Sequence, residues 1–190
     1  MNARARKKTI LAFTLKKERK SRTTVISSGV ILQRNMILVD SREKKWSNIE
    51  DYFQRHDIPY KVTKLDEGDY MLAGVDGITI DRKRNIDECC TNLCSNDSSR
   101  FWREVRRAKK KNMRFIVLVE HGSNYKSIKD VTKWKSRYTK VPGKWVAEEM
   151  YRCHIAYGVE WIFCSKGSTG KIIVELLGQY KSKGGGGCVK

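Results

Sequence analysis

The strongest constraint on the fold is an uninterrupted apolar run at residues 115–119. Because side chains of a strand alternate between the two faces of a sheet, such a run is typical of a strand that is buried on both faces. Shorter strand patterns lie at residues 36–39, 60–65, 69–73, 78–83 and 159–163. The chain is therefore expected to form a sheet whose centre is covered on both sides.

Helical patterns occupy most of the segments between these strands. Capping boxes, in which an N-terminal side chain and an acid three residues later satisfy helix amides, are expected at Ser47 with Glu50 and at Asn85 with Glu88. The expected helices cover residues 47–57, 85–93, 100–111, 144–157 and 169–180. Alternating strands and helices predict an α/β fold in which helices flank the sheet.

Length and charge restrict the class of protein further. At 190 residues the chain predicts a single domain, and 40 Lys and Arg against 21 Asp and Glu give a net charge of +19. Such an excess favours nucleic acid or another polyanion as partner. No apolar run reaches the roughly 18 residues of a membrane span. Six unevenly spaced cysteines suit a reducing compartment, so we expect a cytoplasmic protein.

The charge is concentrated at the start of the chain. Residues 1–35 hold ten Lys and Arg against the single acid Glu18, which gives a net charge of +9 without an apolar period. This segment is expected to be a disordered basic arm, either a nucleic-acid tether, a solvated tail or residues that precede the natural start. Residues 36–180 are the expected folded domain, and the Gly-rich residues 181–190 a flexible tail.

The chemistry-bearing motif lies around one expected hairpin. Gly68-Asp69 is followed by the strand that ends in Asp81, Arg82 and Lys83. Strand alternation places Asp81 and Lys83 on one face and Arg82 on the other. A carboxylate can bind a hard divalent cation, and a neighbouring lysine can orient or deprotonate the attacking water. With the basic charge, this motif predicts a phosphodiesterase that acts on nucleic acid.

The same residues resemble the nuclease domain of the XPF-type structure-specific endonucleases, whose motifs are V-D-x-R-E, G-D and E-R-K-x-x-x-D. The matching blocks are residues 39–43, 68–70 and 81–87, with further agreement at 100–104, 115–122 and 157–159. The resemblance covers residues 36–178 and implies a restriction-endonuclease-like mixed sheet in one domain. It also implies Mg²⁺- or Mn²⁺-dependent cleavage of branched or flapped DNA by a homodimer. By analogy with this family, a stand-alone nuclease domain fits a phage or bacterial genome, so we expect the protein to be nucleoid-associated, or to act in the host cytoplasm if it is phage-encoded. The chain departs from the family at Asp81, where the motif has glutamate.

The resemblance and the chemistry together give each residue a candidate role. Asp69 and Asp81 are the expected metal ligands, Asp40 or Glu43 a further ligand, and Lys83 the group that positions water or stabilises charge. Arg82 is expected either to hold the fold or to contact phosphate. Asp87 is expected to interact with a helix dipole or to pair with one of the two basic residues. Candidate DNA contacts are Arg103, Arg106, Arg107, Lys133, Lys135 and Arg137.

Several alternatives stay open. The basic stretch 126–144 is either a DNA contact, in which Trp134 and Tyr138 stack on unpaired bases, or a solvated loop. The chain could also be a catalytically weak DNA-binding module on the same fold, or a basic RNA- or ribosome-associated protein. A nucleotide cofactor is not expected, because residues 167–171 lack P-loop spacing, and the cysteines lack the paired spacing of a zinc site.

A homodimer through the C-terminal half is expected from the apolar residues of the expected helix 144–157 and the expected strand 159–163. These residues fall on different sides of their elements, so they cannot all face one core. They are Trp145, Met150, Tyr151, Ile155 and Trp161. The alternative is a thick core that they share with the closing helix.

Overall fold

The computed structural model describes residues 36–94, 99–122 and 124–183. The expected basic arm and the tail from residue 184 onward lie outside these ranges. The expected tail begins too early, because the last helix continues to Lys183.

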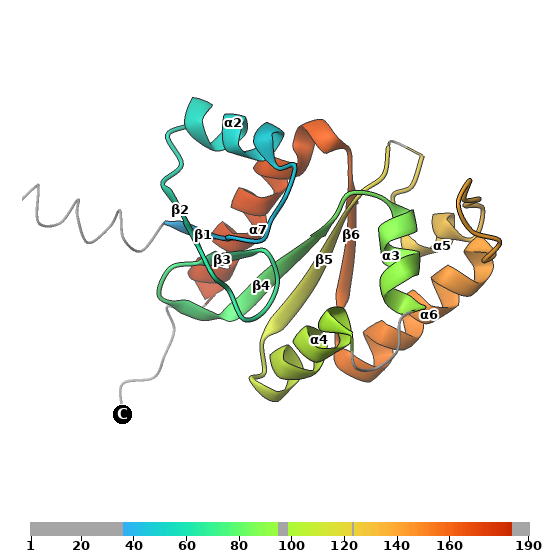
Figure 1. The fold of residues 1–190 in the computed structure, drawn as a ribbon. Coiled ribbons are helices and arrows are strands. Elements are labelled where there is room, and N and C mark those ends of the chain that lie inside the picture. The colour runs from blue at the N-terminus through green and yellow to red at the C-terminus, as the bar shows by residue number, and fades with distance from the viewer. Residues whose placement is uncertain (1–35, 95–98, 123, 184–190) are drawn as a thin grey trace, which may run out of the picture. The chain divides into compact units, whose positions relative to one another are not determined.

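The domain is built on a six-stranded mixed sheet in the order β2-β1-β3-β4-β5-β6 (Figure 1). Strands β1 and β2, β4 and β5, and β5 and β6 pair in parallel, whereas β3 pairs antiparallel with β1 and β4. The strands are β1 (Ile37–Asp40), β2 (Tyr60–Thr63), β3 (Tyr70–Leu72), β4 (Val75–Lys83), β5 (Arg114–Glu120) and β6 (Glu160–Cys164). The expected mixed sheet is confirmed.

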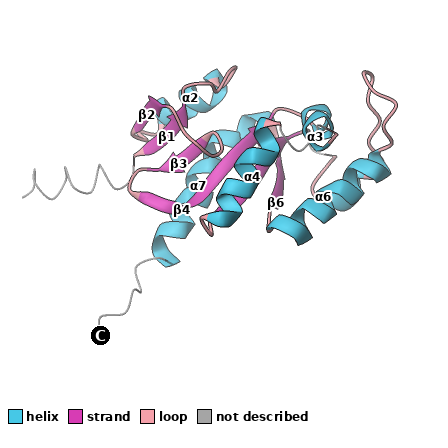
Figure 2. Ribbon diagram, turned by 60° about the horizontal axis from the view of Figure 1, so that its bottom comes forward, coloured by secondary structure: helices cyan, strands magenta, loops and turns pink. Residues whose placement is uncertain are grey.

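Helices cover both faces of this sheet. The α-helices are α2 (Ser47–Arg55), α3 (Ile86–Leu93), α4 (Arg100–Lys110), α5 (Ile128–Val131), α6 (Gly143–Tyr157) and α7 (Thr169–Lys183). Helices α2 and α7 lie on one side, and α3, α4 and α6 on the other, as Figure 2 shows for α7 and α4.

Strand β5 explains why the apolar run constrained the fold so strongly. Its alternate residues Phe115, Val117 and Val119 are fully buried against α3, α4 and α6. The intervening Ile116 and Leu118 are buried against α2 and α7. Each apolar side chain therefore contributes to one of two cores, as strand alternation requires.

Two local predictions needed correction. Ser47 is the first residue of α2 rather than its cap, and Glu50 accepts a hydrogen bond from the Tyr60 hydroxyl at 2.7 Å instead of completing a capping box. At α3 the Asn85 side chain does accept from the Glu88 amide at 2.8 Å. The Glu88 carboxylate, however, accepts from the backbone amide of Arg84 at 2.9 Å, so only half of the expected box forms.

The basic stretch 126–144 is also more ordered than expected. It contains the short helix α5, and Trp134 is only 3% exposed and packs in the core. The prediction that Trp134 stacks on bases is therefore wrong.

Within the described residues, no helix combines the length and apolar character needed to cross a membrane.

The turn that presents Asp69 depends on a glycine. Gly68 has a φ of +65°, and a Cβ there would lie 2.3 Å from the Thr79 hydroxyl and 2.9 Å from the Ile80 carbonyl oxygen. Gly74 has a similar φ of +72°, but a Cβ there would meet nothing within 4 Å. An added side chain at either glycine would strain the backbone, but only at Gly68 would it also clash with neighbouring atoms.

We predict that Gly68→Ala destabilises the domain by about 2 to 4 kcal/mol, because positive-φ strain adds to overpacking. The matched variant Gly74→Ala should cost about 1 kcal/mol from strain alone. Urea unfolding measures both free energies. Equal losses for the two variants would contradict the close packing of the Asp69 turn.

Candidate active site

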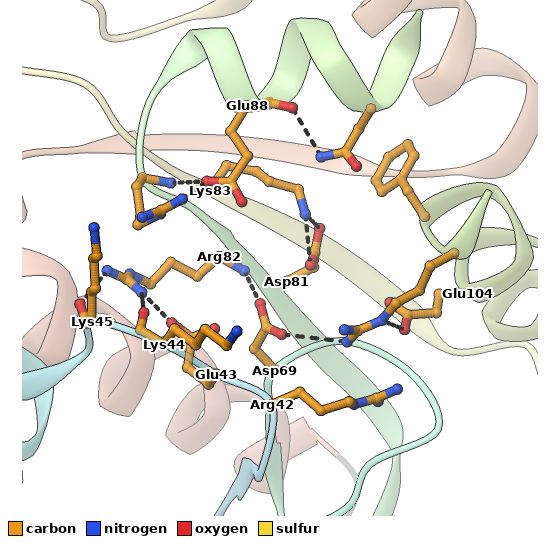
Figure 3. Close-up of a pocket in the computed structure, with 14 residues that line it drawn as sticks. Arg42, Glu43, Lys44, Lys45, Asp69, Asp81, Arg82, Lys83, Glu88 and Glu104 are labelled. Atoms are coloured by element: carbon orange, nitrogen blue, oxygen red, sulfur yellow. Dashed lines mark hydrogen bonds and ion pairs between the residues drawn. The ribbon is translucent and has the colours of Figure 1, made fainter. Parts of the chain in front are cut away.

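A polar pocket of about 300 Å³ lies where β4 ends, beneath α3 and α4. Its walls come from the loop after β1, Asp69, the last residues of β4, one side of α3 and the first half of α4 (Figure 3). Phe101 is its one apolar lining residue among the described positions. The pocket therefore suits a charged ligand rather than an apolar one.

Asp69 is held at this pocket by the β3–β4 hairpin. Its amide donates to the Ile80 carbonyl at 2.8 Å, and its Oδ2 accepts from the Arg82 amide at 2.8 Å. Burial, with the charges of Asp81 and Glu43, raises the pKa of Asp69 well above its usual value. Crowded carboxylates of this kind are an environment that a bound cation would stabilise.

Asp81 and Lys83 point to the same face of β4, as strand alternation predicted (Figure 3). The Lys83 Nζ lies 2.9 Å from Oδ1 and 2.7 Å from Oδ2 of Asp81. Asp81 is therefore a buried carboxylate at the wall of the pocket, and the Lys83 ammonium balances its charge.

The charge state of Lys83 limits its chemistry. Burial opposes the charged ammonium, but the neighbouring carboxylates of Asp81 and Asp69 outweigh burial and raise the pKa of Lys83. The side chain therefore stays protonated at neutral pH. Of its three expected roles, orientation of the water and stabilisation of charge suit a protonated amine, whereas deprotonation of the water would need the neutral amine.

Arg82 points to the opposite face and is 4% exposed. Its guanidinium donates to Glu120 from Nε at 3.1 Å and from Nη2 at 3.3 Å, and it also contacts the Glu43 carboxylate. The remaining donors face the carbonyls of Lys45 at 3.0 Å and Lys44 at 3.5 Å. All five N–H donors are occupied, so Arg82 holds the fold instead of reaching a phosphate.

Glu120 extends this buried network to the last helix. Its Oε1 accepts from the hydroxyl of Thr169, the first residue of α7, at 2.6 Å. Sequence reasoning noted the block that contains Glu120 but assigned it no role. Its position directly after the apolar run 115–119 could have indicated a structural role, because a carboxylate buried there needs a charged or hydrogen-bonding partner.

Two expected catalytic residues, Asp40 and Asp87, do not line the pocket, although the Asp40 amide donates to the Asp69 carbonyl at 2.8 Å. The Asp40 carboxylate accepts from the Arg42 amide at 2.7 Å, from two guanidinium nitrogens of Arg42 at 2.8 and 2.6 Å, and from the Leu65 amide at 3.1 Å. Burial raises its pKa, yet the hydrogen bonds and charge of Arg42 lower the pKa of Asp40 overall. With its oxygens occupied and outside the pocket lining, Asp40 is not placed as a metal ligand.

Asp87 also lies outside the lining of the pocket. It pairs with neither Arg82 nor Lys83, whose partners are described above. It accepts a hydrogen bond from the hydroxyl of Ser136 instead. Glu43 does line the pocket, but its carboxylate is engaged by Arg82.

The candidate DNA contacts fall into two groups. Arg103 is exposed on α4, whereas Arg106 and Arg107 are half-buried, and Arg107 pairs with Glu67 at 3.1 Å. Lys133, Lys135 and Arg137 are all exposed on the loop between α5 and α6. Sequence reasoning missed Arg100, which lines the pocket 3.9 Å from Asp69 and pairs with Glu104 at 2.6 Å.

The sequence matches a known domain family. A family model described as the ERCC4 domain matches residues 39–176. Since this match spans most of the sequence, the chain belongs to the ERCC4 domain family. No curated protein matches the sequence significantly.

Two solved structures share the fold. XPF from Aeropyrum pernix superposes with a TM-score of 0.57 at 17% identity, over 77% of this chain and 65% of that chain. XPF from Aeropyrum pernix in complex with DNA gives a TM-score of 0.58 at 18% identity, over 79% of this chain and 66% of that chain. The match thus spans less than two thirds of those chains, and identity this low shows the common fold alone.

The buried arginine network yields a stability prediction. Glu120→Gln should lower the free energy of unfolding by about 3 kcal/mol, because it leaves a buried guanidinium short of one counter-charge. A matched control is Glu149→Gln, whose partner Arg152 is 72% exposed. Loss of that surface pair should cost less than about 1 kcal/mol in chemical denaturation. A Glu120 variant as stable as the control would refute the structural role of Arg82.

Proposed function

We propose that this protein is a metal-dependent DNA endonuclease that hydrolyses phosphodiester bonds at branched or flapped DNA. The observation that carries this proposal is the pairing of Asp81 with Lys83 in the pocket that Asp69 also lines. Family membership supports the nuclease class, and the net charge of +19 supports a polyanionic substrate. The solved complex of XPF from Aeropyrum pernix with DNA supports DNA as that polyanion.

Asp69 and Asp81 are the residues that would hold Mg²⁺ or Mn²⁺. No three His, Cys, Asp or Glu side chains gather into a metal cage within residues 36–94, 99–122 and 124–183. Mg²⁺ is nevertheless usually held by one or two carboxylates together with waters and substrate phosphate oxygens. The position of Asp81 at the wall of the pocket and the crowding of carboxylates around Asp69 fit that mode. When bound, the ion would polarise the phosphate and acidify a water molecule.

The chain's own basic residues complete the proposed site. Protonated Lys83 would orient the water or stabilise negative charge that develops on the phosphate. Lys44 and Lys45 are exposed beside the pocket, and Arg100 lies at its rim with a partly exposed side chain. These cations would attract the DNA backbone and place it over the two carboxylates.

A homodimer through α6 also belongs to this proposal. Tyr151 and Ile155 are exposed on this helix, and Ile155 is 81% exposed. Met150 is instead buried in the core, and the Trp161 indole donates to its carbonyl oxygen at 3.1 Å. The interface would therefore use Tyr151 and Ile155 rather than all five apolar residues considered from the sequence.

The alternative is a catalytically weak DNA-binding module on the same fold. The observation that favours it is the shorter acid Asp81, which is already neutralised by Lys83. Labelled duplex, flap, fork and four-way-junction DNA, each with Mg²⁺, Mn²⁺ or a chelator, would separate the two. The endonuclease proposal expects cleavage of a branched substrate that the chelator abolishes. Binding without cleavage in either metal would support the alternative.

We predict that Asp69→Asn and Asp81→Asn each reduce cleavage by at least about 100-fold, the scale on which loss of one transition-state contact acts. DNA affinity in chelator should stay near that of the wild type, because many phosphate contacts supply it. Asp76→Asn is a matched control, since Asp76 is exposed on the same strand β4. Near-normal cleavage by either pocket variant would refute the site assignment.

A further inference from the structure

We propose that residues 133–140, which we name the Tyr138 loop, bind an unpaired nucleotide of the DNA substrate. In this arrangement Tyr138 stacks on the base, and Asp87 positions the loop relative to the cleavage pocket. The inference rests on the proposed function and adds to it the DNA feature that the protein recognises. Neither Tyr138 nor the Asp87 contact belongs to the pocket described above.

Tyr138 is the most exposed large apolar side chain of the described residues, with 88% of its surface accessible. Lys135, Arg137 and Lys140, which surround it in the sequence, are exposed as well. An aromatic ring among cations matches the surface of a nucleic-acid strand, because the cations meet phosphates and the ring meets a base. Neither core of the domain uses this ring.

Several hydrogen bonds hold the loop in one conformation despite its exposure. The Ser136 hydroxyl oxygen accepts from the amides of Tyr138 at 2.9 Å and Thr139 at 3.2 Å. The Thr139 hydroxyl in turn accepts from the Val141 amide at 3.2 Å. Trp134 anchors the beginning of the loop in the core. A ring presented by an ordered loop loses little conformational entropy when it binds.

The far end of the loop is fixed by close backbone packing. A Cβ at Gly143 would lie 2.3 Å from the Val131 carbonyl oxygen and 2.5 Å from that of Trp134. Both stems of the loop are therefore attached to the body of the domain, and the loop is not a free lysine-rich segment.

Asp87 connects this loop to the cleavage pocket. The Ser136 hydroxyl donates to Asp87 Oδ1, and Asp87 lies on α3 directly before Glu88, which lines the pocket. A shift of this contact would move the loop relative to the carboxylates. Asp87 is thus a positioning residue, which gives this acid of the motif a role that needs neither metal nor substrate.

The proposed ligand is an unpaired base because of how bases stack. In a continuous duplex both faces of each base are covered by neighbours, so a protein ring finds no free face. A flap, a branch or a strand end exposes one. The Tyr138 loop would therefore recognise the interruption, while its cations contact flanking phosphates without regard to sequence.

The test measures binding in chelator with the full chain. The probe is a flap DNA with the fluorescent base 2-aminopurine at the junction. Quenching of the 2-aminopurine fluorescence reports stacking on this base, and fluorescence anisotropy reports the affinity for the DNA. Tyr138→Ala should lose the quenching and bind the flap about 5- to 100-fold more weakly, whereas Tyr138→Phe should keep both. Affinity for the uninterrupted duplex should stay the same for all three proteins. Val62→Ala, at an exposed apolar residue of the edge strand β2, is the control and should behave as wild type.

A second pair of variants tests the positioning role of Asp87. Asp87→Asn keeps an oxygen that can accept from Ser136, so it should retain the preference for flap over duplex. Asp87→Ala should lose that preference, and Ser136→Ala should lose it too. If Asp87→Asn also loses the preference for flap over duplex DNA, the charge of Asp87 and not its hydrogen bond to Ser136 is responsible. That result would overturn the positioning role of Asp87.

The outcomes also separate this inference from the proposed function. A wild-type protein that neither binds nor cuts DNA would refute both. A wild-type protein that binds and cuts flap DNA, with unchanged quenching and affinity in Tyr138→Ala, would refute the Tyr138 loop alone. Equal loss of flap and duplex binding in Tyr138→Ala would also overturn it, because the ring would then not recognise an unpaired base.

Discussion

The buried guanidinium of Arg82 is the interaction on which the rest of the pocket depends. Burying a cation is costly unless opposite charges and hydrogen bonds surround it, and here Glu120 and Glu43 supply both. These contacts attach the back of β4 to β5, to the loop after β1 and, through Thr169, to α7. The backbone amide of the same residue holds the Asp69 carboxylate at 2.8 Å. One residue thus fixes the strand and orients an acid on its other face.

The two faces of β4 consequently divide the work. Arg82 also lines the pocket, but Glu120, Glu43 and two backbone carbonyls occupy its donors, whereas Asp81 and Lys83 present a carboxylate and an ammonium to the pocket. Strand alternation makes this division unavoidable, because adjacent residues must point in opposite directions. In the proposed nuclease, the back of the strand supplies rigidity and the front supplies the groups that would meet a metal ion and a phosphate. The shorter acid at Asp81 is accommodated by direct contact with Lys83.

The sequence predicted those features that depend on local periodicity. The central strand, the flanking helices and the opposite directions of Arg82 and Lys83 follow from the periodicity of apolar and charged residues, whereas the mixed sheet was expected from the family resemblance. The enclosure of Asp40 could not be predicted, because one of its donors, Leu65, lies 25 residues away. The Asp87 contact to Ser136 spans 49 residues and depends on how the loop before α6 folds back. The burial of Trp134 could not be predicted either, because it also depends on how this loop folds. The polar and basic residues next to Trp134 in the sequence suggested an exposed ring.

The central claim is that Asp69 and Asp81 form the metal-binding side of the pocket. The most direct test is a crystal structure of the protein with Mn²⁺ and a bound DNA, with the ion located by its anomalous scattering. The account predicts an anomalous peak in contact with both carboxylates and none at Asp40, and the peak should disappear in Asp81→Asn. A peak bound by Asp40, or DNA seated in the pocket with no peak at Asp69 and Asp81, would contradict it.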